Sequence, residues 1–369
     1  MSNPLKELNR YGQSTWMDYI TRSMIESGEL DRLIDEDAIT GMTSNPSIFH
    51  KAMVKSGDYQ EALERLAKAG LSTGEIYETL AVEDIQAAAD HLRPVYDASK
   101  GYDGFISLEV SPNLAFDTEE TIKEAKRLWE KVSRPNLLIK VPGTSEGIPA
   151  IEHLLTEGFN VNITLLFSHD YYAQVRAAYL KALENRLKEG KPIDRISSVA
   201  SFFLSRIDTY VDKELEKLGT EEAKRLLGKT AVAYAKIAYK DYLRDFHTER
   251  FEKLQREGAK SQRPLWASTS TKNPDYHDLL YVEPLIGKDV INTLPPNTID
   301  AFRDHGKAAN TVEEDFHNAY ETIQAVEKLG ISMKDVTDKL QKDGVQAFID
   351  SWNQIMDGLE EKRKELARA

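Results

Sequence analysis

The sequence predicts a single α/β domain of the (β/α)8, or TIM, barrel class, enlarged by additional helices. Three observations support this prediction. Short apolar runs alternate with longer amphipathic stretches, polar residues gather toward the ends of several of these runs, and 369 residues suffice for one barrel with insertions. Strands that alternate with helices pair in parallel, and a set of eight such units favours a closed barrel over an open sheet.

The predicted strands are the short apolar runs. The first seven cover 14–20, 38–43, 104–110, 136–141, 160–167, 196–203 and 264–269. The eighth is less distinct and falls within 280–293. Helical periodicity occupies 118–131, 145–157 and 168–188, while the intervals 43–104 and 204–258 each hold more than one helix.

No linker and no fixed repeat divides the chain, so we expect one domain over residues 1–369. Residues 1–13 form a lead-in to the first strand. From Thr311 onward the pattern is helical only, with breaks expected near Gly330 and Gly344. We expect these C-terminal helices, 311–369, to pack as a layer on the outside of the barrel.

The composition limits the possible functions. A net charge of −13 disfavours binding to nucleic acid or to an anionic membrane, although a local group of cations can still hold a small anion. The chain has no cysteine, which excludes disulfides, thiolate metal sites and a cysteine nucleophile. No apolar stretch is long enough to span a bilayer, and residues 1–16 lack the apolar segment of a signal peptide. We therefore expect a cytoplasmic protein.

We expect neither a metal nor a cofactor. The sequence holds no P-loop, no glycine-rich nucleotide motif after a strand and no HExxH motif. Adjacent acid–histidine pairs such as Asp304–His305 are interpreted as surface positions, since neighbours on one element do not converge on one ion.

Lys140 is the leading candidate for a catalytic residue. It lies in the apolar run Asn-Leu-Leu-Ile-Lys-Val-Pro-Gly at 136–143. Burial disfavours the charged ammonium, and a neutral amine attacks a carbonyl to form an imine. The alternative is a lysine that extends along the strand end into solvent. The apolar residues on both sides of Lys140 favour the catalytic interpretation.

Two carboxylates end other predicted strands. Glu109 ends the run before that of Lys140 and could shuttle protons as a carbinolamine forms and loses water. A structural ion pair with Lys140 is compatible with that role. Asp18 ends the first strand and could take the hydroxyl proton that starts a retro-aldol cleavage. Its alternative interpretation is a helix N-cap.

Further polar residues could bind a substrate. Thr43 and Asn45 could hydrogen-bond sugar hydroxyls, while Ser47 could cap the following helix. Asn162 and Thr164 would extend this lining, because buried amides must bind either each other or a ligand.

The later strands offer a possible phosphate site. Arg206, Ser270 and Lys272 follow strands six and seven, where barrels often hold a phosphate on backbone amides and cations. Ordinary surface polarity is the alternative for each of these three residues.

With these residues in place, the chain resembles the transaldolases from Asp18 to about Lys272. The matching segments are Gly-Met-Thr-Ser-Asn-Pro-Ser at 41–47, Ser-Leu-Glu-Val at 107–110, Leu-Ile-Lys-Val-Pro at 138–142, Asn-Val-Asn-Ile-Thr-Leu-Leu-Phe at 160–167 and Val-Ala-Ser-Phe-Phe at 199–203, followed by Arg206. The length and the segment Trp-Ala-Ser-Thr-Ser-Thr-Lys-Asn at 266–273 are similar to the longer bacterial branch of that family.

The resemblance implies a (β/α)8 barrel that transfers a dihydroxyacetone unit between sugar phosphates in the pentose phosphate pathway. The donor would be sedoheptulose 7-phosphate or fructose 6-phosphate, and the acceptor glyceraldehyde 3-phosphate or erythrose 4-phosphate. Lys140 would form the Schiff base, Glu109 would shuttle protons through water with Thr164, and Asp18 would be the acid/base for cleavage and re-addition.

The resemblance also implies the substrate-binding residues. They are Asn45 and Asn162 for the hydroxyls of the three-carbon unit, Thr43, Ser201 and Phe203 for the pocket lining, and Arg206, Ser270 and Lys272 for the phosphate. Lys272 departs from the family, because many relatives carry arginine there. A lysine gives a point charge rather than a bidentate fork.

Two alternatives to a transaldolase remain at this point. A class I aldolase on the same fold would use the same lysine but release free dihydroxyacetone, although Asp18 favours transfer. A non-catalytic, helix-rich acidic scaffold is more remote, because it leaves Lys140 unexplained. The expected partners are sugar phosphates, without nucleic acid or membrane, and the expected state is a monomer or a homodimer.

Overall fold

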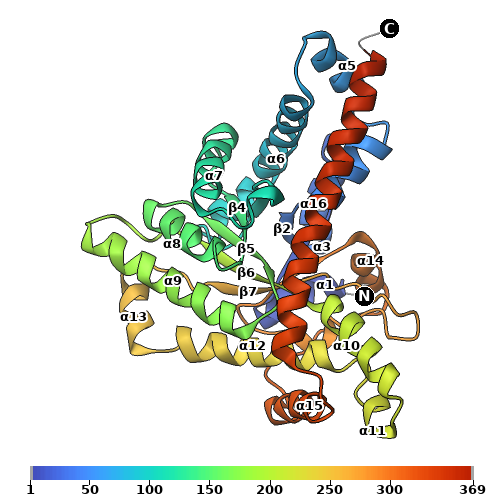
Figure 1. Ribbon diagram of the computed structural model, residues 1–369. Coiled ribbons are helices and arrows are strands. Elements are labelled where there is room, and N and C mark those ends of the chain that lie inside the picture. Colours follow the sequence, from blue (N-terminus) through green and yellow to red (C-terminus); the bar gives the residue numbers. More distant parts are fainter. Residues whose placement is uncertain (1–2, 367–369) are drawn as a thin grey trace.

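Eight parallel strands form a closed barrel in the computed structural model, which describes residues 3–366 (Figure 1). The strands follow one another in chain order around the barrel, and β8 pairs with β1 to close it. They are β1 (Ser14–Met17), β2 (Ile39–Thr43), β3 (Phe105–Glu109), β4 (Leu137–Pro142), β5 (Val161–Leu166), β6 (Ser198–Phe203), β7 (Arg263–Ala267) and β8 (Ile291–Leu294). The predicted (β/α)8 fold is confirmed, and each strand overlaps its predicted interval.

Every residue of β4, β5 and β6 is buried. Parallel strands have this burial because helices cover their outer face and side chains fill the barrel interior. Adjacent strands are in register at the level of the central lysine, with Glu109 opposite Lys140 and Lys140 opposite Asn162. The side chains of Glu109, Lys140 and Asn162 therefore share one layer of the barrel.

Helices connect the strands and surround the barrel. In α7, for example, Asp117 accepts a hydrogen bond from the backbone N–H of Glu120 as the N-cap, and Ala125 and Leu128 lie on the buried face. The α-helices are α1 (Pro4–Leu8), α2 (Arg22–Glu26), α3 (Glu29–Asp37), α4 (Pro46–Phe49), α5 (Gln60–Lys68), α6 (Thr73–Ala98), α7 (Thr118–Val132), α8 (Gly147–Glu157), α9 (His169–Lys188), α10 (Leu204–Leu218), α11 (Glu221–Lys224), α12 (Thr230–Phe246), α13 (Glu249–Arg256), α14 (Pro296–His305), α15 (Phe316–Lys328) and α16 (Met333–Leu366). Shorter helical turns are η1 (Asn9–Tyr11), the π-helix η2 (His50–Lys55), η3 (Pro112–Leu114) and η4 (Glu283–Leu285).

The long helix α16 differs from the sequence prediction in two respects. It continues through Gly344, so the predicted break there is wrong, whereas the break near Gly330 is confirmed between α15 and α16. It also crosses the carboxyl ends of the strands instead of lying only on the outer wall. Gln341 Nε2 donates a hydrogen bond of 2.8 Å to the carbonyl of Gly143, directly after β4. Figure 1 shows α16 running from α15 past the barrel to α5 and α6.

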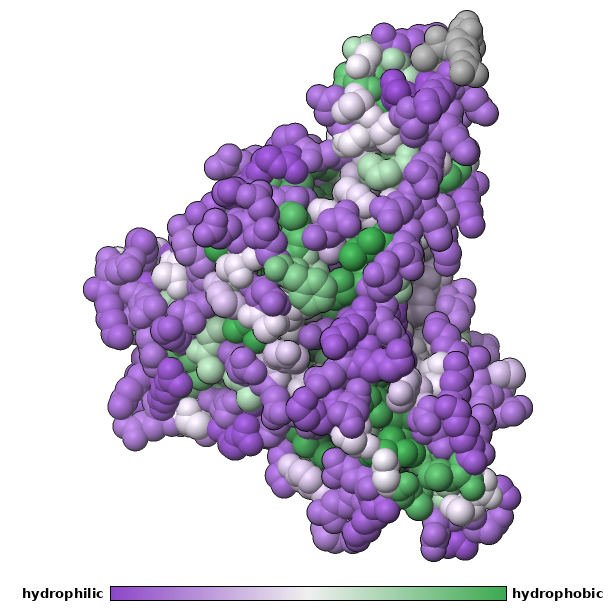
Figure 2. All heavy atoms as spheres, in the orientation of Figure 1, coloured by the Kyte–Doolittle hydropathy of each residue, from purple (hydrophilic) through white to green (hydrophobic). Residues whose placement is uncertain are grey.

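The surface is polar. Within residues 3–366, no helix combines the length and the apolarity needed to cross a membrane. The face shown in Figure 2 is mainly hydrophilic, with apolar side chains visible in bands between the helices.

A buried polar network lies at the opposite, amino-terminal end of the barrel. Arg263 Nη1 donates a hydrogen bond of 2.7 Å to Ser14 Oγ, which in turn donates to Asp103. Trp16 Nε1 donates to the same carboxylate at 2.7 Å, and Arg263 Nη2 lies 3.7 Å from it. The network joins the start of β7 to β1 and to the residue that precedes Gly104 and β3, so it holds three parts of the barrel wall together.

Candidate active site

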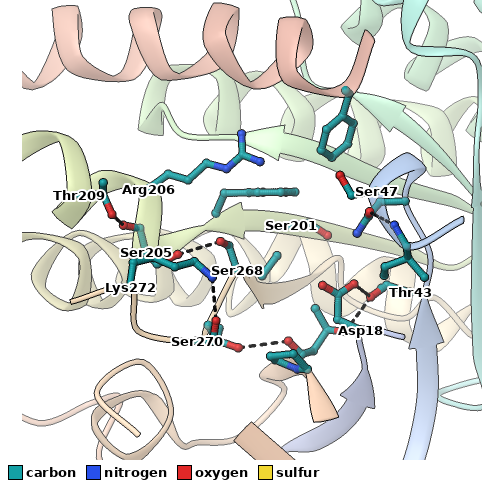
Figure 3. A pocket seen from close by; sticks show the side chains of 18 of the residues that line it. Asp18, Thr43, Ser47, Ser201, Ser205, Arg206, Thr209, Ser268, Ser270 and Lys272 are labelled. Carbon is teal, nitrogen blue, oxygen red and sulfur yellow. Dashed lines mark hydrogen bonds between the residues drawn. The ribbon is translucent and has the colours of Figure 1, made fainter. Parts of the chain in front are cut away.

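A cavity of about 680 Å³ opens at the carboxyl ends of the strands, where barrel enzymes carry their catalytic groups (Figure 3). Its wall is built from residues on or after β1, β2, β4, β6, β7 and β8, together with residues of α16. The predicted site residues on this wall are Asp18, Thr43, Asn45, Lys140, Ser201, Phe203, Arg206, Ser270 and Lys272. The structure thus brings together segments that lie up to 254 positions apart, from Asp18 to Lys272.

Lys140 is held inside the barrel by β4. Its side chain is only 5% exposed, so the alternative of a lysine that extends into solvent is wrong. The Nζ atom donates a hydrogen bond of 2.9 Å to the carbonyl of Ser44 and lies 3.6 Å from Glu109 Oε2. One amine thus faces both the cavity and a buried carboxylate.

Glu109 has an unusual environment for a carboxylate. Burial raises its pKa to about 7, although the cation of Lys140 opposes this shift; the charge of Asp18 raises it further. Neither carboxylate oxygen has a hydrogen-bond partner among residues 3–366. A group with a pKa near neutrality and free oxygens can both give and take protons under physiological conditions.

Asp18 directly follows β1 and reaches the cavity. Burial raises the pKa of this carboxyl, while Lys140 and a 2.7 Å hydrogen bond donated by Thr43 Oγ1 oppose the shift. The Thr43 hydroxyl also hydrogen-bonds that of Thr293 at 2.7 Å, which fixes its orientation. The next helix, α2, is capped by Thr21, so the N-cap interpretation of Asp18 is wrong.

Asn162 is fully buried behind the cavity wall. Its amide nitrogen donates a hydrogen bond of 2.9 Å to Ser107 Oγ, and its amide oxygen accepts one of 2.7 Å from Ser201 Oγ. Of these three residues only Ser201 lines the cavity. Thr164 is also buried, and its hydroxyl has no hydrogen-bond partner among the described residues.

Asn45 both caps a helix and lines the cavity. Its side-chain oxygen accepts a hydrogen bond of 3.0 Å from the backbone N–H of Ile48 at the start of α4. The predicted cap, Ser47, instead hydrogen-bonds Ser351 of α16 at 2.9 Å. The Asn-Pro turn thus positions Asn45 at the mouth and ties the same segment to the long C-terminal helix.

Cations gather at one side of the cavity. Arg206, in the first turn of α10, lies over the ring of Phe203 at 5.5 Å, and burial lowers its pKa. Lys272 Nζ donates a hydrogen bond of 2.8 Å to Ser270 Oγ, as Figure 3 shows. Ser268, just after β7, has a φ of 54°, an uncommon left-handed conformation that occurs preferentially at functional turns.

Many residues of the cavity wall were missed from the sequence. Among them are two cations and three residues of α16, namely Lys51, Lys213, Leu340, Asp343 and Phe348. For Lys213 a signal existed, because it lies seven positions after Arg206 and therefore on the same helical face. The α16 residues had no such signal, since nothing in their local pattern indicates that the helix crosses the barrel mouth.

The arrangement suits carbonyl chemistry on an anionic substrate. A buried amine lies beside one carboxylate with a pKa near 7 and shares its cavity with a second carboxylate. Arg206 and Lys272 supply positive charge within a chain of net charge −13. Within residues 3–366, the one group of three histidine and carboxylate side chains with the spacing of metal ligands lies outside this cavity.

Comparison with known proteins gives a consistent result over nearly the whole chain. A family model described as Transaldolase/Fructose-6-phosphate aldolase matches residues 15–359. The chain is 46% identical to Transaldolase 2 of Nostoc punctiforme, with 99% of each chain covered. It is 47% identical to the transaldolase of Thiobacillus denitrificans, with 96% of this chain and 99% of the relative covered. It is also 46% identical to the transaldolase of Thermobifida fusca, with 97% of each covered.

Proposed function

The chain belongs to the transaldolase/fructose-6-phosphate aldolase family, and from this premise we propose that Lys140 forms the Schiff base of its reaction. The activity of the chain is that of a transaldolase, and the protein is a transferase. The relatives matched over nearly their full length carry the name transaldolase, so the aldolase and scaffold alternatives are not favoured. One observation carries the assignment of Lys140: it is a buried amine that lines the cavity beside Glu109.

Imine formation is the first step. The neutral Lys140 amine attacks C2 of a ketose phosphate, its nitrogen loses a proton and the former carbonyl oxygen gains one, which gives a carbinolamine. The hydroxyl then leaves as water when a second proton is supplied, and a protonated imine remains. Glu109 is the proton shuttle in this scheme, because its pKa of about 7 allows it to release and recover a proton. The hydroxyl of Thr164 would orient the water molecule that carries protons between Glu109 and the carbinolamine.

Cleavage of the carbon–carbon bond is the second step. Asp18 takes the proton of the C4 hydroxyl, the C3–C4 bond breaks, and its electron pair moves into the protonated imine to form an enamine. An aldose phosphate is released, and three carbons stay on Lys140. When an acceptor aldose phosphate enters, the enamine attacks its carbonyl and Asp18 returns the proton to the new hydroxyl.

Binding of the intermediate separates a transferase from an aldolase. Asn45 and Asn162 would hold the hydroxyls of the three-carbon unit, with Thr43, Ser201 and Phe203 around them. Asn162 is held by Ser107 and Ser201, so its reach to the substrate would pass through the Ser201 hydroxyl or require an exchange of partners. Arg206, Ser270 and Lys272 would bind the phosphate.

We also propose the biological setting of the reaction. The donors would be sedoheptulose 7-phosphate or fructose 6-phosphate and the acceptors glyceraldehyde 3-phosphate or erythrose 4-phosphate, in the pentose phosphate pathway of the cytoplasm. The protein would need neither metal nor cofactor for this chemistry, because the protonated imine is the electron sink. Its partners would be sugar phosphates, and its state a monomer or a homodimer.

Reductive trapping tests the role of Lys140. Borohydride added with fructose 6-phosphate should reduce the imine and add the mass of one reduced triose to the peptide that contains Lys140. The Lys140→Met variant is the control and should stay unmodified. An unmodified Lys140 in the natural chain would overturn the assignment. Release of free dihydroxyacetone, compared with transfer to erythrose 4-phosphate, separates the aldolase alternative from the transferase.

A further inference from the structure

Three cations of the cavity wall come from different elements. Lys51 lies on η2, Arg206 on α10 and Lys272 in the segment after β7. None of the three forms a direct ion pair with a carboxylate of residues 3–366. Unpaired positive charges in one cavity repel each other. This local group of cations occurs in a chain whose net charge is −13. Such a cluster is a site for an anion of more than one charge.

Lys272 interacts electrostatically with the other two cations. Burial lowers the pKa of Lys272, and the charges of Arg206 and Lys51 lower it further. Because Lys51, Arg206 and Lys272 all line the same cavity and the charges of the first two act on the third, we treat these three residues as one cation cluster.

We propose that Lys51 is a phosphate-binding residue, which acts together with Arg206 and Lys272 on the phosphate of the sugar substrate. This inference rests on the proposed function and deepens it. A lysine at position 272 offers a single point charge where an arginine would offer a bidentate fork. A second lysine that lines the same cavity supplies the donor and the charge that Lys272 alone lacks.

The position of Lys51 gives this role a structural basis. The π-helix η2 continues directly from α4, whose N-cap is Asn45. Single π-helical turns are rare and occur frequently at functional sites. One short segment after β2 thus supplies both Asn45 and Lys51 to the cavity wall.

The Lys51→Gln variant tests the proposal, with inorganic phosphate as the probe. The inhibition constant of phosphate and the KM for fructose 6-phosphate should both rise about tenfold, the usual effect of losing one charged hydrogen bond. Lys51→Arg should keep both values near those of the natural chain. The matched control is Lys55→Gln, which removes the same charge from the same π-helix at a residue that does not line the cavity.

Two outcomes would contradict the role of Lys51. One is an unchanged phosphate inhibition constant in Lys51→Gln. The other is an equal rise of this constant in Lys55→Gln, which would show that the loss of any positive charge near the cavity weakens phosphate binding. Dihydroxyacetone has no phosphate, so borohydride trapping with this compound measures imine formation at Lys140 independently of phosphate binding. A natural chain that traps no dihydroxyacetone would overturn the proposed function, whereas the phosphate titration still decides on Lys51.

A second, independent cluster lies outside the active site. His277 and Asp278 belong to the loop between β7 and β8, and His305 ends α14. All three are exposed, and one ligand atom of each lies within 4.8 Å of the others. Asp278 Oδ1 is 3.1 Å from His305 Nε2 and 3.7 Å from His277 Nδ1. Tetrahedral Zn²⁺ places neighbouring ligand atoms roughly 3.3–3.6 Å apart.

A fourth residue, Asp304, lies beside this cluster and contacts one of its histidines. Asp304 Oδ2 lies 3.1 Å from His305 Nδ1. A carboxylate on the second ring nitrogen favours the tautomer in which Nε2 can bind an ion, as in many zinc proteins, and an ion would replace the present contact of Nε2 with Asp278. His277 Nδ1 accepts a hydrogen bond of 3.2 Å from the backbone N–H of Leu279, a role that an unprotonated ring nitrogen can fill. A zinc ion would compete with that backbone hydrogen bond.

We infer that His277, Asp278 and His305 form a surface Zn²⁺ site that clamps the loop carrying Lys272 to α14. Calorimetric titration of the metal-free full chain with Zn²⁺ should show one ion per chain at micromolar affinity. His305→Ala should lose at least about tenfold in affinity, and Asp304→Asn should lose about tenfold through the orientation of the ring. His317→Ala, at an exposed histidine of α15 paired with Glu321, is the control. No saturable binding, or binding unchanged in His305→Ala, would refute the site.

Discussion

Asp18 and Glu109 are both buried carboxylates near Lys140, but their partners differ. Asp18 accepts a hydrogen bond from Thr43, whereas the Glu109 oxygens have no hydrogen-bond partner among the described residues. Burial raises the pKa of both groups, and it raises that of Glu109 to about 7. Environments that separate two carboxylates in this way assign them different roles in proton transfer. Glu109 suits the proton exchange of imine formation, and Asp18 suits a fixed contact with one substrate hydroxyl.

Replacement of Asp18 should separate imine formation from carbon–carbon cleavage. In Asp18→Asn the amide keeps the shape of the side chain but cannot take the C4 hydroxyl proton. We expect kcat to fall by about 10²–10⁴, the usual contribution of a general base. Borohydride should then trap the intact hexose phosphate on Lys140, measured by peptide mass, in place of the triose found in the natural chain. A triose adduct in undiminished yield would show that another group removes the proton.

The pKa of Glu109 predicts a pH dependence of stability. Its folded-state pKa of about 7 lies above its ordinary value of 4.5, because burial disfavours the charged form. The folded chain therefore binds more protons than the unfolded chain between these values. The contribution of Glu109 to stability is complete below pH 4.5 and is lost as the pH rises through 7, by on the order of 3 kcal/mol.

Glu109→Gln should remove this contribution to the pH dependence. Urea unfolding midpoints at pH 5 and pH 8 measure it, and the natural chain should lose more stability between the two values than the variant does. Comparison of the two proteins cancels the titration of all other groups. Equal losses in both proteins would mean that Glu109 is already ionised at pH 5.

At the scale of single residues, the sequence predicted those features that depend on the pattern of apolar and polar residues along a strand. The apolar run around Lys140 predicted that this side chain is buried, and the register of the barrel makes Asn162 its neighbour on the next strand. Capping was harder to predict, because Asn45 and Ser47 can both cap a helix and only the backbone geometry chooses between them. Lys51 was missed, since nothing in its local sequence indicates a π-helix that turns toward the cavity.

At the scale of elements, α16 decides the shape of the active site. Leu340, Asp343 and Phe348 from this helix line the cavity, and Trp352 packs edge-to-face on Tyr77 at 4.7 Å. Helix geometry lets one continuous element reach the barrel mouth and still extend to α5 and α6. The docking of α16 should therefore set both stability and access of the substrate to Lys140.

At Gly344 the helix α16 packs closely on the barrel. A Cβ atom there would lie 3.1 Å from Leu165 Cδ2 and 3.4 Å from Arg206 Nη1. In Gly344→Val the larger side chain should push the helix outward and displace Arg206, with a loss of about 1–3 kcal/mol in unfolding free energy and a higher KM for fructose 6-phosphate. Thermal unfolding and steady-state kinetics measure the two effects.

The control for this substitution is Lys342→Val. It places the same β-branched residue on the exposed face of the same helix and so reports helix propensity alone. A KM that rises equally in both variants would exclude close packing as the reason for the glycine. The sequence predicted a break at Gly344 because glycine usually disfavours helix interiors; the contact with β5 that favours glycine there depends on tertiary structure.

At the scale of the whole molecule, the two ends of the barrel carry different polar groups. The carboxyl ends of the strands hold partly unpaired groups around a cavity, namely Lys140, Glu109 and the three cations. The amino ends hold the paired network of Arg263, Asp103 and Ser14. In (β/α)8 barrels the first end determines catalysis and the second stability. The sequence predicted the catalytic end from its polar strand ends, but it did not predict the network, because that depends on a contact between the first and seventh strands.

This division predicts that stability can be lowered without loss of catalysis. Arg263→Met would leave the buried Asp103 carboxylate without its cation, and removal of one partner of a buried pair typically costs about 3–5 kcal/mol. Because Arg263 lies at the amino end of β7 and does not line the cavity, kcat at a temperature where the variant is folded should match that of the natural chain. Arg195→Met, at an exposed arginine 3.9 Å from Asp194, is the control and should change the unfolding midpoint little. A kcat that falls together with the unfolding midpoint in Arg263→Met would mean that the base of the barrel transmits strain to Lys140, and that the two ends are coupled rather than separate.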